Sequence, residues 1–270
     1  DSFGGIGFGL GIAGAAMATV ISQLVVFFVF IVMLFFKDHS YISFNLNDFT
    51  FSTEILWDII KVGLPASLSM IVMAVGQGVF NKILVHISVE TVAAYQVAGR
   101  LDMLVFLPIF SIAASLTTLI GMFYGAKEFE ALRFTIRYGI ISALIITIFS
   151  SALVYIFADQ VVRFFTEDES IVLIAVNFLQ IFAFAYPFIA VGITTGRVLQ
   201  GLGKGLPVLV ITIVRVLGVS APLALFFVFI MEKSVEWVWY SMMLSTVVAF
   251  AIGLTWLVST IKKLPVKKSD

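Results

Sequence analysis

Cysteine is absent from the 270-residue sequence, and histidine occurs only twice. Without cysteine the chain can form neither a disulfide framework nor a cysteine-ligated metal site. His39 and His86 have no second ligand at a suitable spacing, so metal catalysis is not expected. The sequence also lacks the phosphate-binding loop of ATP-driven enzymes and the nucleophile and zinc motifs of hydrolases. It therefore does not predict an enzyme.

Charged side chains are scarce as well. They make up 12% of the residues and sum to a net charge of zero, which argues against nucleic acid as a partner. Apolar residues make up 61%, and the mean hydropathy is +1.14. A soluble domain is typically about 45–50% apolar and about 25% charged. The composition therefore predicts an integral membrane protein.

The apolar segments predict an all-α polytopic protein with about seven membrane-spanning helices, since a span needs about 20 apolar residues. The expected spans are residues 7–36, 62–87, 91–124, 134–157, 171–199, 206–231 and 235–261. The short polar turn at 88–91 predicts that the two helices joined by it lie side by side and antiparallel. Pro65 is placed in a first turn, and Pro108 in mid-span, facing the bundle or a cavity.

The chain is divided into four regions. Residues 1–36 hold the first helix, 37–61 a polar linker on the membrane surface, 62–263 a six-helix lobe, and 264–270 a basic tail. The chain begins with Asp1 and lacks the basic region of a signal peptide. Its beginning is therefore interpreted as a cut end within a larger protein.

Lysine and arginine residues indicate the orientation, because cytoplasmic segments are enriched in them. They gather on one predicted side of the membrane, which carries positions 37, 61, 127, 133, 137, 197 and 204 and the C-terminal lysines. The sequence therefore predicts a multi-pass protein of the cell membrane with a cytoplasmic C-terminus and linker.

Amide side chains within the spans are candidates for a binding site. Gln77 and Asn81 lie one helical turn apart in the second span, and Asn177, Gln180 and Tyr186 lie in the fifth. Such groups can join helices through hydrogen bonds worth about 0.6–2 kcal/mol each. They can equally line a polar cavity. The sequence leaves both interpretations open.

Three charged residues need an explanation. Asp102 is the only carboxylate plausibly within a span, and it is interpreted as a solvated group at interface depth. Arg100 is two residues away, so the two side chains point in different directions and need not pair. Arg215 lies about ten residues inside the sixth span, where an arginine requires a partner.

Several short motifs occur in order along almost the whole chain. They are G-I-A-G-A-A-M-A-T-V-I-S at 11–22, G-L-P-A-S-L at 63–68, V-A-A-Y-Q-V-A-G-R-L at 92–101, F-L-P at 106–108, G-M-F-Y-G-A-K at 121–127, Y-P-F at 186–188, Q-G-L-G-K-G at 200–205, and Arg215 followed by Pro222. Their order and spacing resemble those of the multidrug and toxic compound extrusion (MATE) transporters.

The resemblance implies a twelve-helix transporter of two six-helix lobes, of which this chain holds the sixth helix and the C-terminal lobe. It implies export of organic cations or amphipathic compounds in exchange for Na⁺ or protons. The expected partners are those small molecules, membrane lipid and the N-terminal lobe of the same protein. Within the resemblance, Gln77, Asn81, Asn177, Gln180 and Tyr186 are expected to line the substrate cavity.

One departure from the family pattern concerns the coupling ion. Some members have a glutamate eight residues after the proline of G-L-P and an aspartate in the tenth helix. This chain has Met73 at the first position and no carboxylate between residues 171 and 200. The coupling ion is therefore expected to bind in the N-terminal lobe, and no other cofactor is expected.

Two other functions remain open. A flippase for lipid-linked saccharides, from the same superfamily, would need a basic cavity to neutralise a pyrophosphate. The other alternative is a membrane subunit without transport activity.

Overall fold

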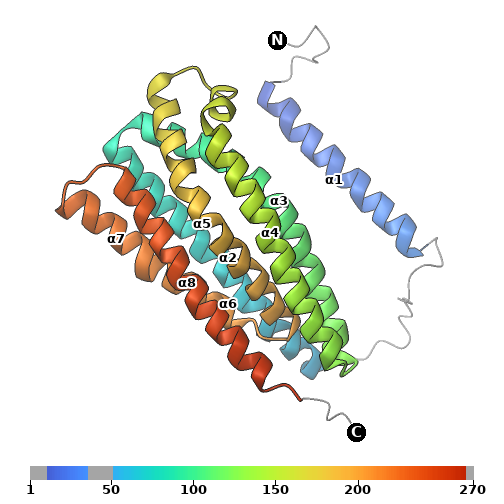
Figure 1. Cartoon of the computed structure of the whole chain (residues 1–270). Coiled ribbons are helices and arrows are strands. Elements are labelled where there is room, and N and C mark those ends of the chain that lie inside the picture. Colours follow the sequence, from blue (N-terminus) through green and yellow to red (C-terminus); the bar gives the residue numbers. More distant parts are fainter. Residues whose placement is uncertain (1–10, 36–50, 266–270) are drawn as a thin grey trace. The chain divides into compact units, whose positions relative to one another are not determined.

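A computed structural model describes residues 11–35 and 51–265 (Figure 1). The chain divides into two units, Asp1–Ser52 and Thr53–Asp270. In the first unit the described part is α1 (Gly11–Phe35), an apolar helix with mostly exposed side chains. The beginning of the predicted first span, most of the linker 37–61 and most of the tail 264–270 lie outside the described residues.

The second unit is built from long helices. They are α2 (Thr53–Ile87), α3 (Val89–Gly125), α4 (Phe129–Arg163), α5 (Glu169–Gly201), a composite helix and α8 (Glu236–Lys262). The composite helix joins α6 (Leu206–Ile213), η2 (Val214–Ser220), α7 (Ala221–Leu225) and η3 (Phe226–Ile230). With α1, the described residues contain seven segments long and apolar enough to span a membrane. The predicted all-α membrane fold is confirmed.

Successive spans run in opposite directions, so their turns gather at two ends of the second unit (Figure 1). The Ser88 end carries the turns at Ser88, Asp168 and Ser234. The Gly203 end carries the turn at 126–128, the turn at Gly203 and the last turn of α8. Gly203 has a φ of +74°, a conformation that glycine adopts without the strain of a side chain.

Side-chain caps fix two of the turns at the Ser88 end. The Ser88 hydroxyl accepts a hydrogen bond of 3.1 Å from the backbone N–H of Thr91. The Asp168 carboxylate accepts bonds from the N–H groups of Ser170 (2.9 Å) and Ile171 (3.4 Å), and from the Ser170 hydroxyl. These bonds hold the pKa of Asp168 below its usual value.

The core of the second unit surrounds α5, which packs mainly against α3, α4 and α8. Small residues along α5, such as Ala175, Ala185 and Ala190, are completely buried. Small side chains allow helices to approach closely in lipid, where hydrophobic attraction between helices is weak. This packing explains why α5 is the most buried of the spans.

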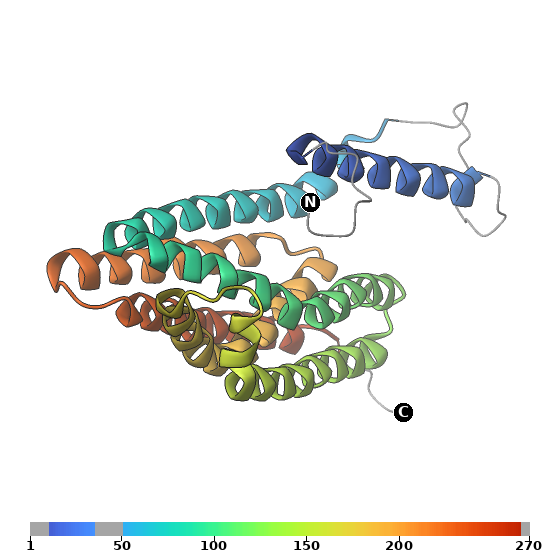
Figure 2. The ribbon, with the colours of Figure 1, turned by 90° about the horizontal axis from the view of Figure 1, so that it is seen from above.

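The helices α2 and α3 meet at the Ser88 end and then diverge (Figure 2). α2 packs mainly against α6, whereas α3 packs mainly against α5 and α4. The prediction that the two lie side by side is therefore correct only near their turn. A short turn fixes where two helices meet, but their packing partners decide the angle between them.

The helix α2 begins at Thr53, earlier than the expected beginning at residue 62. The charged side chains of Glu54, Asp58 and Lys61 do not interrupt the helix. Pro65 consequently lies well inside α2, and its placement in the first turn was wrong. Its ring leaves the carbonyl of Lys61 without the usual intrahelical donor.

Two further prolines differ in their surroundings. Pro187 cannot bond the carbonyl of Ala183, and the Ser151 hydroxyl of α4 donates a hydrogen bond to that carbonyl instead. Pro108 is exposed on the surface of the lobe and does not face this bundle, so that alternative was wrong, and the other, that it faces a cavity, stays a prediction. The buried face of α3 is formed by Leu101, Val105 and Ile109, on another side of the helix.

Candidate functional site

The central feature of the site is a contact between Asp102 on α3 and Tyr186 on α5. The Tyr186 hydroxyl donates a hydrogen bond to Oδ1 of the Asp102 carboxylate. Tyr186 is completely buried, and Asp102 is half-buried. Asp102 lies thirteen residues into α3, about 20 Å along the helix from its beginning. Because it is half-buried and bonded to a buried side chain, its interpretation as a merely solvated group was wrong, whereas its placement at interface depth stays a prediction.

An aromatic wall extends from this contact toward the Ser88 end. On α5, Phe178 and Phe182 stack with ring centroids 4.1 Å apart, and Phe182 contacts Tyr186 at 6.4 Å. Phe178 also meets the Trp239 ring edge-on at 4.9 Å. Tyr95 of α3 stacks on Trp239 at 5.9 Å. Rings held from several sides give the wall a fixed shape.

Arg215 lies in η2, the first π-helical segment of the composite helix. In η2 the N–H of Ala221 bonds to the carbonyl of Val216, five residues earlier. Pro222 accounts for this widening, because its ring crowds the preceding turn and supplies no donor. Arg215 is half-buried and makes no hydrogen bond or ion pair within residues 11–35 and 51–265.

The predicted binding residues do not form one cluster. Gln77 is exposed on α2, whereas Tyr186 is buried against Asp102. Asn81 and Asn177 are half-buried, and each has a buried Oδ1 atom without a hydrogen-bond partner among the described residues. Gln180 is half-buried on α5. The expectation that these five residues contact substrate stays a prediction.

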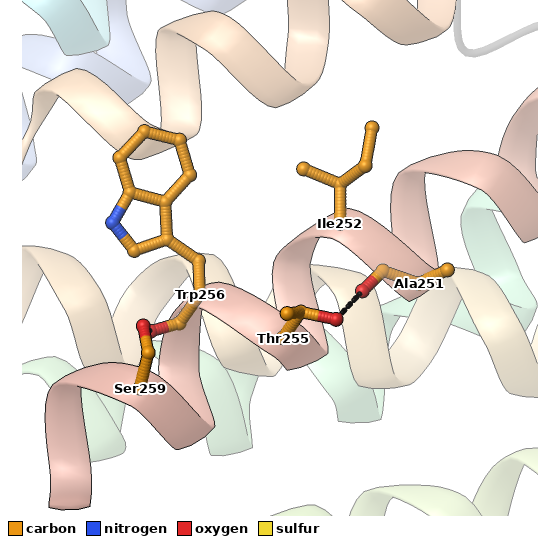
Figure 3. A pocket seen from close by; sticks show the side chains of 5 residues that line it. All are labelled: Ala251, Ile252, Thr255, Trp256 and Ser259. Atoms are coloured by element: carbon orange, nitrogen blue, oxygen red, sulfur yellow. Dashed lines mark hydrogen bonds between the residues drawn. The ribbon is translucent and has the colours of Figure 1, made fainter.

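Two shallow hollows lie elsewhere on the described surface. One, of about 500 Å³, follows a single helix, α8, and is lined by Ala251, Ile252, Thr255, Trp256 and Ser259 (Figure 3). Its hydroxyls already donate to carbonyls of the same helix, Thr255 to Ala251 at 2.7 Å and Ser259 to Trp256 at 2.8 Å. The other, of about 340 Å³, lies between α4 and α5 beside Pro187. Neither provides a charged group for a substrate.

The pairing of Asp102 with Tyr186 was not recognised from the sequence, although both residues were noted separately. Tyr95 was missed entirely. A carboxylate within a span is itself a signal of function, because such groups are costly in lipid. Interpreting Asp102 as a merely solvated group discarded that signal.

A family model described as MatE matches residues 65–226. The chain is 26% identical over 258 residues to the probable multidrug resistance protein NorM of Thermotoga maritima, covering 95% of this chain and 55% of that protein. It is 28% identical over 199 residues to the multidrug export protein MepA of Staphylococcus aureus, covering 74% and 44%. The chain thus spans about half the length of the curated relatives it matches.

The fold is similar to two solved transporter structures. One is a MOP superfamily transporter from Pyrococcus furiosus, described as having a binding pocket of reversed polarity, with a TM-score of 0.88 and 32% identity. The other is a multidrug resistance MATE family transporter in an outward-facing conformation, with a TM-score of 0.87 and 32% identity. Each match covers 97% of this chain and 59% of the other. Since the family model also covers more than half of the sequence, the chain belongs to the MatE family of membrane transporters.

Proposed function

We propose that this chain forms the C-terminal lobe of an exporter in the cell membrane that exchanges organic cations or amphipathic compounds for Na⁺ or protons. The lobe works with an N-terminal lobe of the same protein by alternating access. The names of the relatives, multidrug resistance and multidrug export proteins, support the multidrug class of substrate. The proposed C-terminus is cytoplasmic, following the distribution of lysine and arginine.

The observation that carries this proposal is the Asp102 carboxylate, bonded to Tyr186 within the membrane-spanning part of the lobe. A carboxylate has about four acceptor positions on its two oxygens, and the Tyr186 hydroxyl occupies one. The remaining positions can take a proton, Na⁺ or the cationic group of a substrate. Binding any of these cations reduces the cost of a charge in a membrane.

Competition for Asp102 links ion entry to substrate exit. A coupling ion and a cationic substrate that use the same carboxylate displace one another, which is the requirement for exchange. Tyr186 directly precedes Pro187, which removes one backbone hydrogen bond from α5. Because Asp102 is bonded to Tyr186, binding or release of a cation at Asp102 acts on this part of α5. We propose that Gln77, Asn81, Asn177 and Gln180 contact the uncharged parts of the substrate.

The proposed role of Asp102 changes the expectation for the coupling ion. The sequence pattern assigned coupling to the N-terminal lobe, because Met73 occupies the position of a family glutamate. Asp102 gives the C-terminal lobe a carboxylate of its own, and we propose it as an ion site in addition to one in the other lobe.

The test measures dye transport in proteoliposomes. They contain the protein expressed from its whole coding sequence. A fluorescent organic cation such as ethidium is expected to move when a Na⁺ or proton gradient is imposed. Asp102→Asn is expected to reduce the gradient-driven part to what the ion site of the other lobe supports. The matched control is Asp159→Asn, since Asp159 is exposed and pairs with Arg163 at 2.9 Å. Undiminished gradient-driven efflux by Asp102→Asn would refute the role of this carboxylate, and dye movement indifferent to both gradients would refute the coupling.

A further inference from the structure

The hollow on α8 is suited to hydrocarbon rather than to a polar compound. Trp256 and Ile252 extend to the same side of the helix and bound it (Figure 3). The hydroxyls of Thr255 and Ser259 donate to carbonyls of α8 itself, at 2.7 and 2.8 Å. A hydroxyl has one proton to donate, so neither offers a donor to an occupant. The only other side-chain donor is the indole of Trp256, a ring typical of membrane interfaces.

The hollow faces away from the second unit. The opposite side of α8 carries Gly253, Leu257 and Thr260, which are buried. A β-carbon at Gly253 would lie 3.5 Å from the Ile211 side chain, so this side is packed against α6. Thr255 and Ser259, in contrast, are exposed. Since α8 is long and apolar enough to span a membrane, the side that bears the hollow is available to lipid.

Two lysines lie beyond the hollow on the same side of α8. Lys262 follows Thr255 by seven residues, and Lys263 follows Ile252 by eleven, which is about two and three helical turns. Both lysines are exposed. The 27 residues of α8 extend over about 40 Å, close to the thickness of a bilayer with its headgroups. The lysines therefore lie at headgroup level when the hollow lies within the hydrocarbon.

Two more cations reach the end of α8 from other elements. The Lys204 ammonium, from the turn before α6, donates a hydrogen bond of 3.4 Å to the Thr260 hydroxyl. The Arg133 guanidinium of α4 donates one of 3.0 Å to the carbonyl of Leu264. Thr260 and Leu264 are four residues apart, or one turn, so the two cations lie close together beside Lys263.

The charge of this basic cluster, formed by Arg133, Lys204, Lys262 and Lys263, is not compensated by ion pairs in the described part of the chain. The ion pairs found there involve Arg163, at the Ser88 end. Arg133 and Lys204 each donate to a neutral oxygen, which leaves their charge in place. Basic groups placed beside membrane helices are a known means of binding anionic headgroups.

We propose that the basic cluster and the hollow on α8 form a binding site for an anionic phospholipid. The phosphate is held by Lys262 and Lys263 with Lys204 beside them, and one acyl chain lies in the hollow against Trp256. An anionic headgroup joined to a hydrocarbon chain matches both parts, whereas a soluble phosphate would leave the hollow empty. The inference does not depend on the proposed exporter function.

Brominated lipids test the site, because bromine on an acyl chain quenches the fluorescence of a tryptophan that it contacts. The protein, expressed from its whole coding sequence, is reconstituted in phosphatidylcholine with increasing fractions of brominated phosphatidylglycerol or brominated phosphatidylcholine. The difference from Trp256→Phe gives the signal of Trp256 alone. Phosphatidylglycerol is expected to bind about twentyfold more tightly, at about fivefold for each lysine.

Substitutions assign this preference to the lysines. The double variant Lys262→Gln, Lys263→Gln is expected to reduce it at least about tenfold. The control Lys82→Gln, Lys233→Gln removes the same charge from two exposed residues near the Ser88 end and is expected to leave it unchanged. Helical circular dichroism shows whether each variant is folded. If the double variant is not, Lys263→Gln alone decides, with an expected reduction of about fivefold.

Three results would overturn the lipid site. One is equal quenching of Trp256 by the two brominated lipids. Another is the absence of quenching by either, which would mean that protein, such as the N-terminal lobe or a second copy, covers the hollow. The third is an equal loss of preference in the two double variants. All are measured without a gradient or a substrate, so failure of the exporter function would leave these results unchanged.

Discussion

Replacing Gly205 with alanine is expected to destabilise the lobe, because this glycine lies against backbone rather than against side chains. A β-carbon at Gly205 would lie 2.6 Å from the Val62 carbonyl oxygen, 2.9 Å from its α-carbon and 3.1 Å from the Lys61 carbonyl oxygen. Helix backbone cannot move aside as a flexible side chain can. The turn before α6 must therefore shift away from α2, and the contact that joins the two helices opens.

The expected cost follows from overpacking, which typically amounts to about 1–3 kcal/mol. For a unit of this size, about 2 kcal/mol corresponds to a decrease of about 4–8 °C in Tm. The measurement is the apparent Tm of the detergent-purified protein, followed by helical circular dichroism. Because α2 packs mainly against α6, its unfolding is expected to begin at this end.

Gly63→Ala is the matched control. Gly63 lies in the same region of α2, and a β-carbon there would meet nothing within 4 Å. Alanine is favoured over glycine inside a helix by about 0.5–1 kcal/mol, so this variant is expected to be as stable as the unsubstituted protein or more so. A Gly205→Ala protein with an unchanged Tm would refute the close approach of α6 to the α2 backbone.

Three further predictions concern other contacts. Ser151→Ala is expected to cost about 1–3 kcal/mol of stability, because it leaves the buried carbonyl beside Pro187 without a donor. Gly76→Ala is expected to lower Tm by placing a methyl against the stiff side chain of Val216, and Val216→Ala in the same chain is expected to restore much of the loss. Asp168 has a lowered pKa in the folded protein, so its stabilising effect is complete above the unfolded value of about 3.9 and disappears as the pH falls through the lower folded value. The Tm advantage of the unsubstituted protein over Asp168→Asn should therefore shrink below about pH 4.

Each of these has its own control. Ser259→Ala removes an exposed hydroxyl bonded within its own helix and should leave Tm unchanged. Gly78→Ala adds a methyl where nothing lies within 4 Å, and equal losses from Gly76→Ala and Gly78→Ala would exclude the contact with Val216. If the Tm difference between the unsubstituted protein and the Asp168→Asn variant is independent of pH, the carboxylate is excluded as its cause.

The membrane fold was predictable because it follows from local properties of the sequence. Backbone groups in lipid must be hydrogen-bonded, and a continuous apolar segment of about 20 residues meets this requirement within itself by forming a helix. The turns at Ser88 and Asp168 were visible from their polar residues. The beginning of α2 was not, since Glu54, Asp58 and Lys61 are equally compatible with a surface linker and with the end of a long helix.

The candidate site was predictable only in part. Tyr186 and Arg215 were noted because polar residues in lipid are costly. Their partners depend on which faces of α3, α5 and η2 meet, and that is decided by packing between segments far apart in the chain. The π-helical turn that carries Arg215 is a further example, because Pro222 indicates a distortion without specifying the direction in which side chains are turned.

By itself, therefore, the sequence determined an all-helical membrane protein of the MatE family, with its spans and a small set of polar residues inside them. Hydropathy and motif order are local quantities, and they suffice for that conclusion. The tertiary structure was needed to show that Asp102 meets Tyr186, that Arg215 has no hydrogen bond or ion pair among the described residues, and that α2 diverges from α3. These relations depend on the crossing of helices, which is determined by the summed fit of many side chains and small residues rather than by any one segment.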